Sequence, residues 1–214
     1  PSADNPLLIT MNADCEMKAT FVSALDSLYV DDDASCDPGP QDSTTSDPGE
    51  NGTAEHPFDS IQEAIELAAE GASIIVRPGV YYENISFLNK DIRLMGIDVN
   101  DTTPESWPVI DGAGSGPVVR FSRGQSLRRQ LTGFVITRGV GQIAGAIYCD
   151  GASPTIANCL IVGNRATDLN GAAVYCRDSQ AVLTNCTVAD NYAGRGAGLT
   201  LVNSNVTVLN SILW

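Results

Sequence analysis

The chain has 214 residues, of which 43% are hydrophobic and 6% aromatic, so it is long enough to bury a sizeable globular core. Its 26 acidic and 12 basic residues give a net charge of −14, which disfavours nucleic acids and anionic membranes as partners and favours divalent cations. No run of 18 apolar residues occurs, so we expect no insertion into a membrane.

Residues 1–28 differ in pattern from the rest of the chain. The stretch NPLLITMNADCEMKATFV, residues 5–22, resembles the closing strands of a bacterial cell-surface repeat domain of the β-grasp type. The resemblance implies that residues 1–28 are the end of a preceding surface-type β domain or an N-terminal extension. It also implies a secreted or cell-surface location in a bacterium. Because the chain begins at Pro1 without a signal peptide, we expect a mature protein or an excised fragment.

Residues 29–58 are predicted to form a strand followed by a long acidic loop. Eight acidic residues and no Lys or Arg lie between Asp31 and Glu55. Ca²⁺ takes six to eight oxygen ligands, which such a loop could supply, although the spacing is not that of an EF-hand. The alternative is a solvated loop that keeps the protein soluble. The best candidate ligands, and the only cofactor site that the sequence indicates, are Asp31, Asp32, Asp33 and Asp37.

Residues 59–71 are predicted to form one amphipathic helix. Ser60 and Glu63 have the spacing of a capping box, and Gly71 stands where the helix is expected to stop. Ile61, Ala64, Ile65 and Ala68 fall on one helical face. A single helix of this kind ahead of a repetitive β region predicts a cap over the first coil. The adjacent His56, the only histidine, has no ligand partners at suitable spacing and is predicted to be structural.

One stretch then occurs twice and begins a third time, at residues 146–164, 173–191 and 198–214. The first two copies are offset by 27 residues at every matched position, and the next two by 25. Apolar residues alternate within each copy, which is the period of a strand. Repeats of this length indicate stacked units in which each coil covers the next. The predicted inward columns are Ile147/Val174/Leu199, Cys149/Cys176/Leu201, Ile156/Leu183/Val208, Cys159/Cys186/Ser211 and Ile161/Val188/Leu213.

An asparagine recurs at one position of the repeat, as Asn158, Asn185 and Asn210. Asparagine tolerates a left-handed bend, and its amide can bond to the amide of the next coil. These three residues are therefore predicted to form a structural ladder. Weaker copies lie upstream, where Gly96 and Gly133 align with the asparagines.

Short strands in coils of about 25–27 residues, with asparagine at the bends, resemble the right-handed parallel β-helix of the pectin-lyase-like superfamily. The resemblance covers residues 72–214. It implies an all-β solenoid with an N-terminal capping α-helix, of the secreted bacterial type. Because Trp214 directly follows a strand, we expect the solenoid to continue beyond residue 214 or to be covered by another chain, the alternative being that Trp214 itself closes the end.

The six cysteines form no CxxC pair, which argues against a zinc ribbon. Side chains on adjacent parallel strands point the same way, so we expect Cys149, Cys159, Cys176 and Cys186 to be stacked, buried free thiols rather than disulfides. Cys15 and Cys36 are the better candidates for a disulfide, which secretion would permit.

The outward positions of the repeated strand carry the candidate binding residues. Tyr148 above Tyr175 could form an aromatic platform for a sugar ring, or a plain cross-strand pair. Asp150 beside Arg177 is predicted to be an ion pair between coils. Together these four residues are the predicted carbohydrate site, with a polysaccharide or cell-surface glycan as its partner.

No catalytic residue is assigned. Lyases of the resembled superfamily combine Ca²⁺-binding carboxylates with an Arg or Lys base, and its hydrolases use clustered aspartates. Glycosidic cleavage needs two carboxyl groups about 5–9.5 Å apart, and the repeated strand supplies no such pair.

The sequence therefore favours a non-catalytic extracellular module, with a structural, adhesive or carbohydrate-binding role, within a larger protein. The first alternative is a polysaccharide lyase or glycoside hydrolase of the pectin-lyase-like type, with or without Ca²⁺. The second is a fibre subunit that associates end to end with copies of itself.

Overall fold

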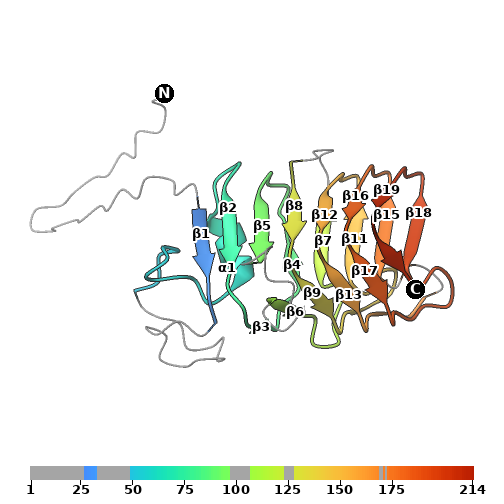
Figure 1. The fold of residues 1–214 in the computed structure, drawn as a ribbon, viewed down its shortest axis with the longest axis horizontal. Coiled ribbons are helices and arrows are strands. Elements are labelled where there is room, and N and C mark those ends of the chain that lie inside the picture. The colour runs from blue at the N-terminus through green and yellow to red at the C-terminus, as the bar shows by residue number, and fades with distance from the viewer. Residues whose placement is uncertain (1–26, 33–48, 97–106, 123–127, 169–170, 172) are drawn as a thin grey trace, which may run out of the picture.

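The computed structural model describes residues 27–32, 49–96, 107–122, 128–168, 171 and 173–214. It confirms the predicted all-β fold of stacked parallel coils with a helix at the N-terminal end. In Figure 1 the coils follow one another along the long axis of the molecule, from β1 to β18. Among the described residues, no helix has both the length and the apolar character needed to cross a bilayer.

Three parallel sheets run along the solenoid, and every strand pairs with its equivalents in the neighbouring coils. The first sheet contains, in order, β1 (Ser27–Val30), β2 (Ser73–Val76), β5 (Arg93–Gly96), β8 (Gln130–Thr132), β12 (Thr155–Ala157), β16 (Val182–Thr184) and β19 (Thr207–Leu209). The second contains β3 (Val80–Tyr81), β6 (Val109–Asp111), β9 (Val135–Thr137), β13 (Leu160–Val162), β17 (Thr187–Ala189) and β20 (Ile212–Leu213). The third contains β4 (Ile85–Ser86), β7 (Val119–Ser122), β11 (Ile147–Asp150), β15 (Val174–Arg177) and β18 (Leu199–Val202).

A fourth, two-stranded ladder joins β10 (Val140–Gly141) to β14 (Arg165–Ala166), in the loops that connect the second sheet to the third. Nine residues separate β17 from β18, whereas eleven separate β13 from β15. The shortening of the repeat offset from 27 to 25 residues is therefore confined to this edge of the solenoid.

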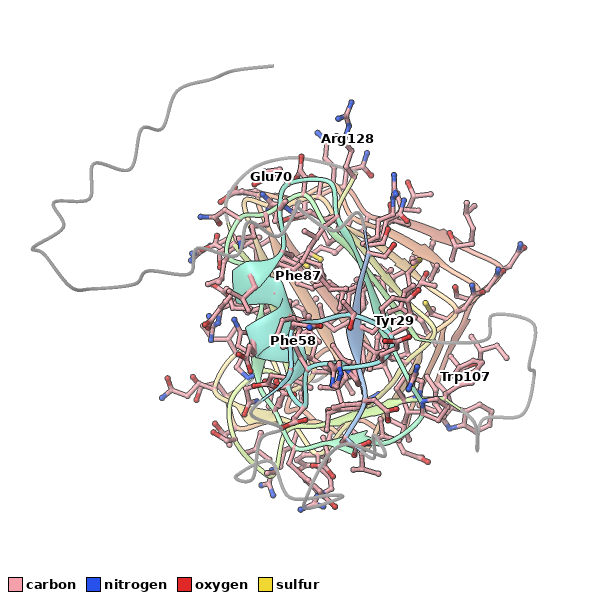
Figure 2. All side chains as sticks on the ribbon, turned by 90° about the vertical axis from the view of Figure 1, so that its left-hand side faces the viewer. Tyr29, Phe58, Glu70, Phe87, Trp107 and Arg128 are labelled. Atoms are coloured by element: carbon pink, nitrogen blue, oxygen red, sulfur yellow. The ribbon has the colours of Figure 1, made fainter. Side chains whose placement is uncertain are left out.

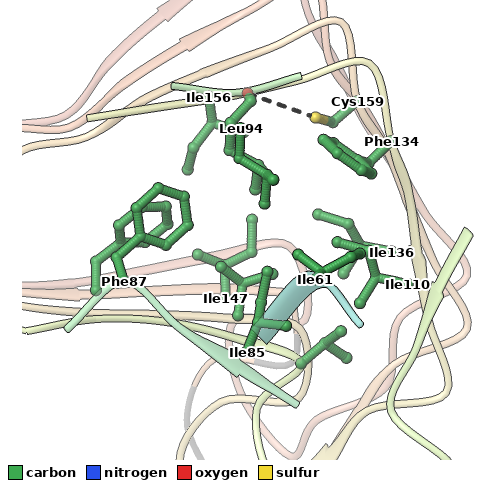
Figure 3. Packing of buried hydrophobic residues seen from close by; sticks show 14 of the residues in the cluster. Ile61, Ile85, Phe87, Leu94, Ile110, Phe134, Ile136, Ile147, Ile156 and Cys159 are labelled. Carbon is green, nitrogen blue, oxygen red and sulfur yellow. Dashed lines mark hydrogen bonds between the residues drawn. The ribbon is translucent and has the colours of Figure 1, made fainter. Parts of the chain in front are cut away.

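The strand register confirms the predicted inward columns. Ile147, Val174 and Leu199 are successive Cα partners in the third sheet, as are Cys149, Cys176 and Leu201. Figure 3 shows this packed interior, with Phe134 and Cys159 adjacent to each other and Phe87 on the opposite wall. Most of these side chains are fully buried, so each coil supplies part of one continuous apolar core.

The predicted asparagine ladder is also present. Asn158, Asn185 and Asn210 have φ angles of 50°, 53° and 48°, in the left-handed region that asparagine tolerates. The amide Nδ2 of Asn185 donates a hydrogen bond to Oδ1 of Asn158 at 3.2 Å.

Gly96 and Gly133 lie in the same column as the asparagines, but each is required for a different reason. Gly133 has a φ of 78°, like the asparagines, whereas Gly96 does not have a positive φ. A Cβ at Gly96 would clash with the carbonyl oxygen of Gly133, so close backbone approach requires the glycine there.

A second asparagine ladder, which we did not predict, lies inside the bend that follows the second sheet. Asn164 is 1% exposed, and its Nδ2 donates to Oδ1 of Asn191 at 3.0 Å. Its own Oδ1 accepts from the backbone N–H of Gly139 at 2.9 Å. The two residues are 27 apart, so the signal was present in the repeat.

The capping helix, α1, spans Ile61–Leu67 and is shorter than the predicted range of 59–71. Ile61, Ala64 and Ile65 are buried against the first coil, and Figure 2 shows the helix across the N-terminal end of the solenoid. The backbone leaves the helical region at Ala68, where ψ is 134°. Nζ of Lys90 donates to the carbonyl oxygens of Ile65, Glu66 and Ala68 at this end of the helix. Gly71 instead adopts a φ of 83° in the turn that leads to β2.

The predicted capping box is only half correct. Oγ of Ser60 accepts a hydrogen bond from the N–H of Glu63, as predicted. The carboxylate that completes the cap comes from Glu83, which accepts hydrogen bonds from the N–H groups of Ile61 and Gln62 at 2.8 and 2.9 Å. The first coil therefore fixes both ends of α1 with side chains distant in sequence.

Strand β1 pairs in parallel with β2, so residues 27–30 are part of the first sheet. The boundary that we predicted at residue 28 falls inside this strand. The resemblance of residues 5–22 to a surface repeat domain lies outside the described residues.

Candidate functional site

The four predicted carbohydrate-site residues lie together on the outer face of the third sheet. Tyr148 is the Cα partner of Tyr175, and Asp150 is the partner of Arg177. They alternate with the buried Ile147 and Cys149, because successive side chains of a strand point to opposite faces.

The two tyrosine rings are stacked. Their centroids are 5.6 Å apart and their planes differ by 1°. On the other side of Tyr148, the guanidinium carbon of Arg120 lies 5.0 Å from its ring centroid. Both faces of Tyr148 are therefore covered by neighbouring strands, and a ligand in this place meets the edge and hydroxyl of the ring.

Tyr175 is less accessible than we predicted for a sugar platform, since it is 7% exposed. Gly171 lies against it: a Cβ at that glycine would be 3.1 Å from Cβ and Cδ2 of Tyr175. The tyrosine pair is thus a cross-strand stack whose exposed portion belongs to Tyr148. Partial burial raises the pKa of Tyr148, and the nearby Asp150 carboxylate raises it to a smaller extent.

Asp150 and Arg177 form a bidentate ion pair. Nε and Nη2 of Arg177 donate to the two carboxylate oxygens of Asp150 at 2.8 and 2.6 Å. The Asp150 carboxylate raises the pKa of Arg177. Among the described strands of the third sheet, Asp150 is the one outward carboxylate, and this pairing occupies both of its oxygens.

A groove runs beside Tyr148, with a volume of about 310 Å³. We call it the Tyr148 groove; its lining residues are Gly116, Pro117, Arg120, Val140, Gly141, Gln142, Ile143, Ala144 and Tyr148. Arg120 and Tyr148 come from the sheet, whereas the residues around β10 form the opposite wall. Arg120 is the one charged residue of this lining, so the groove is positive within an acidic protein.

Our sequence analysis did not identify Arg120 and Gln142. Arg120 is the Cα partner of Tyr148, so extending the column of outward residues one coil upstream would have found it. Gln142 lies in a loop outside the repeated strand, and no periodic signal indicates it.

The predicted Ca²⁺ ligands are only partly described. Oδ2 of Asp31 accepts a hydrogen bond from Nη1 of Arg77 at 2.7 Å, and Oδ2 of Asp32 accepts one from the N–H of Val80 at 3.1 Å. Asp33 and Asp37 lie outside the described residues, as do Cys15 and Cys36. In the part of the chain that the structure describes, no three His, Cys, Asp or Glu side chains gather as a metal site. The Ca²⁺ site remains a prediction.

The four solenoid cysteines are buried and free, as predicted. They line the core rather than the Tyr148 groove, and the thiol of Cys159 donates a hydrogen bond to the carbonyl oxygen of Ala157. No known protein family, curated protein or solved structure matches this chain.

Proposed function

We propose that this chain is an extracellular β-helical module that acts as a rigid spacer and binds a glycan in the Tyr148 groove. The observation that carries the proposal is the set of polar groups along that groove: the guanidinium of Arg120, the hydroxyl of Tyr148 and the amide of Gln142. These groups supply donors and acceptors that suit sugar hydroxyls, and Pro117 and Ile143 supply apolar contact. The volume of about 310 Å³ is at the lower end of small-ligand pockets, which suits a short stretch of a glycan.

The bidentate pairing of Asp150 favours binding over catalysis. A general acid or base must reach the proton that it transfers, whereas both carboxylate oxygens of Asp150 accept from Arg177. The extracellular location is supported by the resemblance of the capping helix and coils to secreted bacterial β-helix proteins.

The experiment is a glycan array, followed by calorimetric titration of the best oligosaccharide. Arg120→Gln should raise the dissociation constant at least tenfold and Tyr148→Phe severalfold, because each removes hydrogen bonds to the ligand. Tyr192→Phe is the matched control, since Tyr192 also stacks with an arginine, Arg165, but does not line the Tyr148 groove.

Two results would contradict the proposal. One is equal binding by the Arg120→Gln variant and the wild-type chain. The other is turnover of a uronate or neutral polysaccharide, with or without Ca²⁺, that Asp150→Ala abolishes. The second result would identify the chain as a lyase or hydrolase.

A second candidate role is self-association at the C-terminal coil. Leu201, Ile212 and Leu213 are 44%, 60% and 42% exposed, and Trp214 is 90% exposed and so does not close the end. Because α1 covers the opposite end of the solenoid, two copies could pair through their C-terminal coils, which would give a dimer rather than a fibre. Light scattering across a dilution series should show a dimer that Leu213→Asp dissociates. A constant monomer mass would exclude this role.

A further inference from the structure

A second depression, of about 390 Å³, lies on the outer face of the first sheet where β5 and β8 begin. We call it the Arg93 depression; its lining residues are Glu70, Gly71, Asp91, Arg93, Arg128 and Gln130. Figure 2 shows Glu70 and Arg128 at the same edge of the molecule. Because it belongs to another sheet, this depression shares no lining residue with the Tyr148 groove.

The two carboxylates of the depression already have partners. Oε2 of Glu70 accepts a hydrogen bond from the N–H of Asp91 at 2.9 Å. Oδ1 of Asp91 accepts one from Nε of Arg129 at 3.2 Å. The Arg129 side chain is only 3% exposed, and its Nη2 donates to the carbonyl oxygen of Asn89 at 2.7 Å. A buried guanidinium therefore offsets part of the negative charge and holds this wall in place.

Arg93 is in a different situation. It is exposed, and its guanidinium has no hydrogen-bond or ion-pair partner among the described residues. By contrast, Arg77, Arg138 and Arg177 each hold a carboxylate of this chain.

Two further polar side chains line the depression with Arg93. Gln130 is its Cα partner across the sheet and presents an amide beside it. Arg128, two residues before Gln130, is a second exposed arginine of the lining; unlike Arg93, it has an interaction of its own within the chain, and it adds positive charge to the depression. The planar fork of an arginine matches the paired oxygens of a carboxylate or sulfate group.

The net charge of −14 is distributed unevenly along the chain, so it repels an anion at the Arg93 depression less than an even distribution would. Residues 1–71 contain sixteen acidic residues and one basic residue, whereas residues 72–214 contain ten acidic and eleven basic ones. The negative charge thus resides in the N-terminal third of the sequence, and the coils are close to neutral.

We propose that the Arg93 depression is an oxyanion-binding site, in which Arg93 and Arg128 hold a carboxylate or sulfate group. Gln130 completes the polar lining. Gly71 also lines the depression, but its backbone N–H donates to the carbonyl oxygen of Asp91 at 2.9 Å and so serves as a reporter rather than as a donor to the anion. The carboxylate or sulfate group is either a free anion or a substituent of a larger ligand. In both cases the same arginine side chains would bind it. The site is independent of the proposed glycan binding in the Tyr148 groove.

The test is an NMR titration of the 214-residue chain with sodium sulfate and sodium acetate, with sodium chloride holding the ionic strength constant. The Nε–Hε signal of Arg93 and the amide signal of Gly71 should shift in a saturable manner with at least one anion. Arg93→Gln should raise the dissociation constant at least tenfold, and Arg93→Lys should raise it less, because lysine keeps the charge but loses the fork. Arg195→Gln is the control, since Arg195 is exposed in another loop and should leave binding unchanged.

A sulfated disaccharide and its unsulfated parent distinguish the two sources. Tighter binding of the sulfated sugar than of free sulfate identifies a carried substituent, and equal binding identifies a free anion. The proposal is overturned if the shifts are linear in anion concentration, if Arg93→Gln binds like the wild-type chain, or if the unsulfated sugar binds equally well. Should Arg93→Gln fail to fold by circular dichroism, Arg128→Gln takes its place with the same expected loss.

Discussion

Asparagine at the bend between the first and second sheets holds a backbone conformation that most residues disfavour. At Asn185 the φ angle is 53°, and the side-chain amide bonds to Asn158 in the preceding coil. The same side chain therefore does two things that are separable by substitution: it tolerates the left-handed bend, and it links two coils.

Asn185→Ala should lower the free energy of unfolding by about 1–3 kcal/mol, because alanine bears the left-handed strain and loses the amide bond. Asn185→Gly should lower it by less, since glycine adopts the bend without strain. Urea denaturation followed by circular dichroism measures both values. If alanine and glycine cost the same, the left-handed conformation contributes nothing at this position.

The stacked cysteines lead to a second prediction about individual side chains. Burial raises the pKa of the Cys159 thiol, and hydrogen bonding with Cys176 followed by burial raises that of Cys149. Both effects lower the fraction of reactive thiolate at these two residues. The hydrogen bond with Cys159 instead lowers the pKa of Cys186, so for that thiol it is burial that keeps the reagent away. Mass spectrometry after iodoacetamide treatment should show Cys149, Cys159, Cys176 and Cys186 unmodified in the folded chain and modified in urea. Rapid labelling of the folded chain would show that the coils open readily.

The capping helix depends on the coil beneath it more than on its own sequence. A helix of seven residues is too short to be stable alone. The Glu83 carboxylate accepts hydrogen bonds from N–H groups of its first turn, and the Lys90 ammonium donates to carbonyl oxygens of its last turn. Glu83→Ala should therefore destabilise the cap by about 1–3 kcal/mol. Gln62→Ala is a milder control, since it leaves the Glu83 cap in place and removes two other hydrogen bonds. These are the bond from the N–H of Ser86 to the Gln62 side chain and the bond from Nε2 of Gln62 to Oε1 of Glu66.

Because the Glu83 carboxyl titrates in a buried position, we also expect the stability of the chain to depend on pH. Burial raises its pKa above the ordinary value, and this effect outweighs its hydrogen bonds with Gln62, Ile61 and Ser60, which lower it. Because the folded state has the higher pKa, the contribution of Glu83 to stability is greatest below the unfolded pKa and is lost as pH rises through the folded pKa.

Glu83→Gln isolates this effect, because glutamine has a similar shape but does not titrate. The stability of the wild-type chain relative to Glu83→Gln should be highest near pH 4 and should fall towards pH 7. Urea denaturation of both proteins at three pH values provides the measurement. A difference that grows with pH would mean that the ionised carboxylate is the better cap.

Strand-level prediction from the sequence succeeded where the repeat was strong and failed where a tertiary contact decided the outcome. Alternation of residues such as Ile147, Cys149 and Ile156 gave the correct faces and register, because each column is constrained by the coils on both sides. The end of α1 and the completion of its cap depend on Lys90 and Glu83, which no local pattern connects to the helix.

The candidate site shows the same division. Tyr148, Tyr175, Asp150 and Arg177 were correctly placed on one face, but the repeat does not reveal that Gly171 lies against Tyr175 or that Arg120 stacks on Tyr148. Loop residues such as Gln142 and the depression around Arg93 arise from how loops and sheet edges meet. They carry no periodicity and became visible only in three dimensions.

Over the whole molecule, stability is expected to vary along the stack, because each coil contacts only its neighbours. The core residue Ile161 of β13 is fully buried, whereas Leu201 of β18 and Leu213 of β20 are 44% and 42% exposed. Hydrogen exchange should therefore be slowest in β11, β12 and β13 and fastest in β18, β19 and β20. Uniform protection across these strands would indicate that another copy of the chain covers the last coil, and dilution would then restore the gradient.

The segment between β17 and β18 is two residues shorter than the segment between β13 and β15, and this difference has a practical consequence. The strands on both sides of these loops keep their partners in spite of it, so the stack absorbs changes in length there without losing alignment. A foreign peptide inserted after β17 should therefore be displayed on the surface while the hydrophobic interior is preserved. The molecule could in this way serve as a carrier for grafted epitopes, and a series of such insertions would define how much added sequence it tolerates.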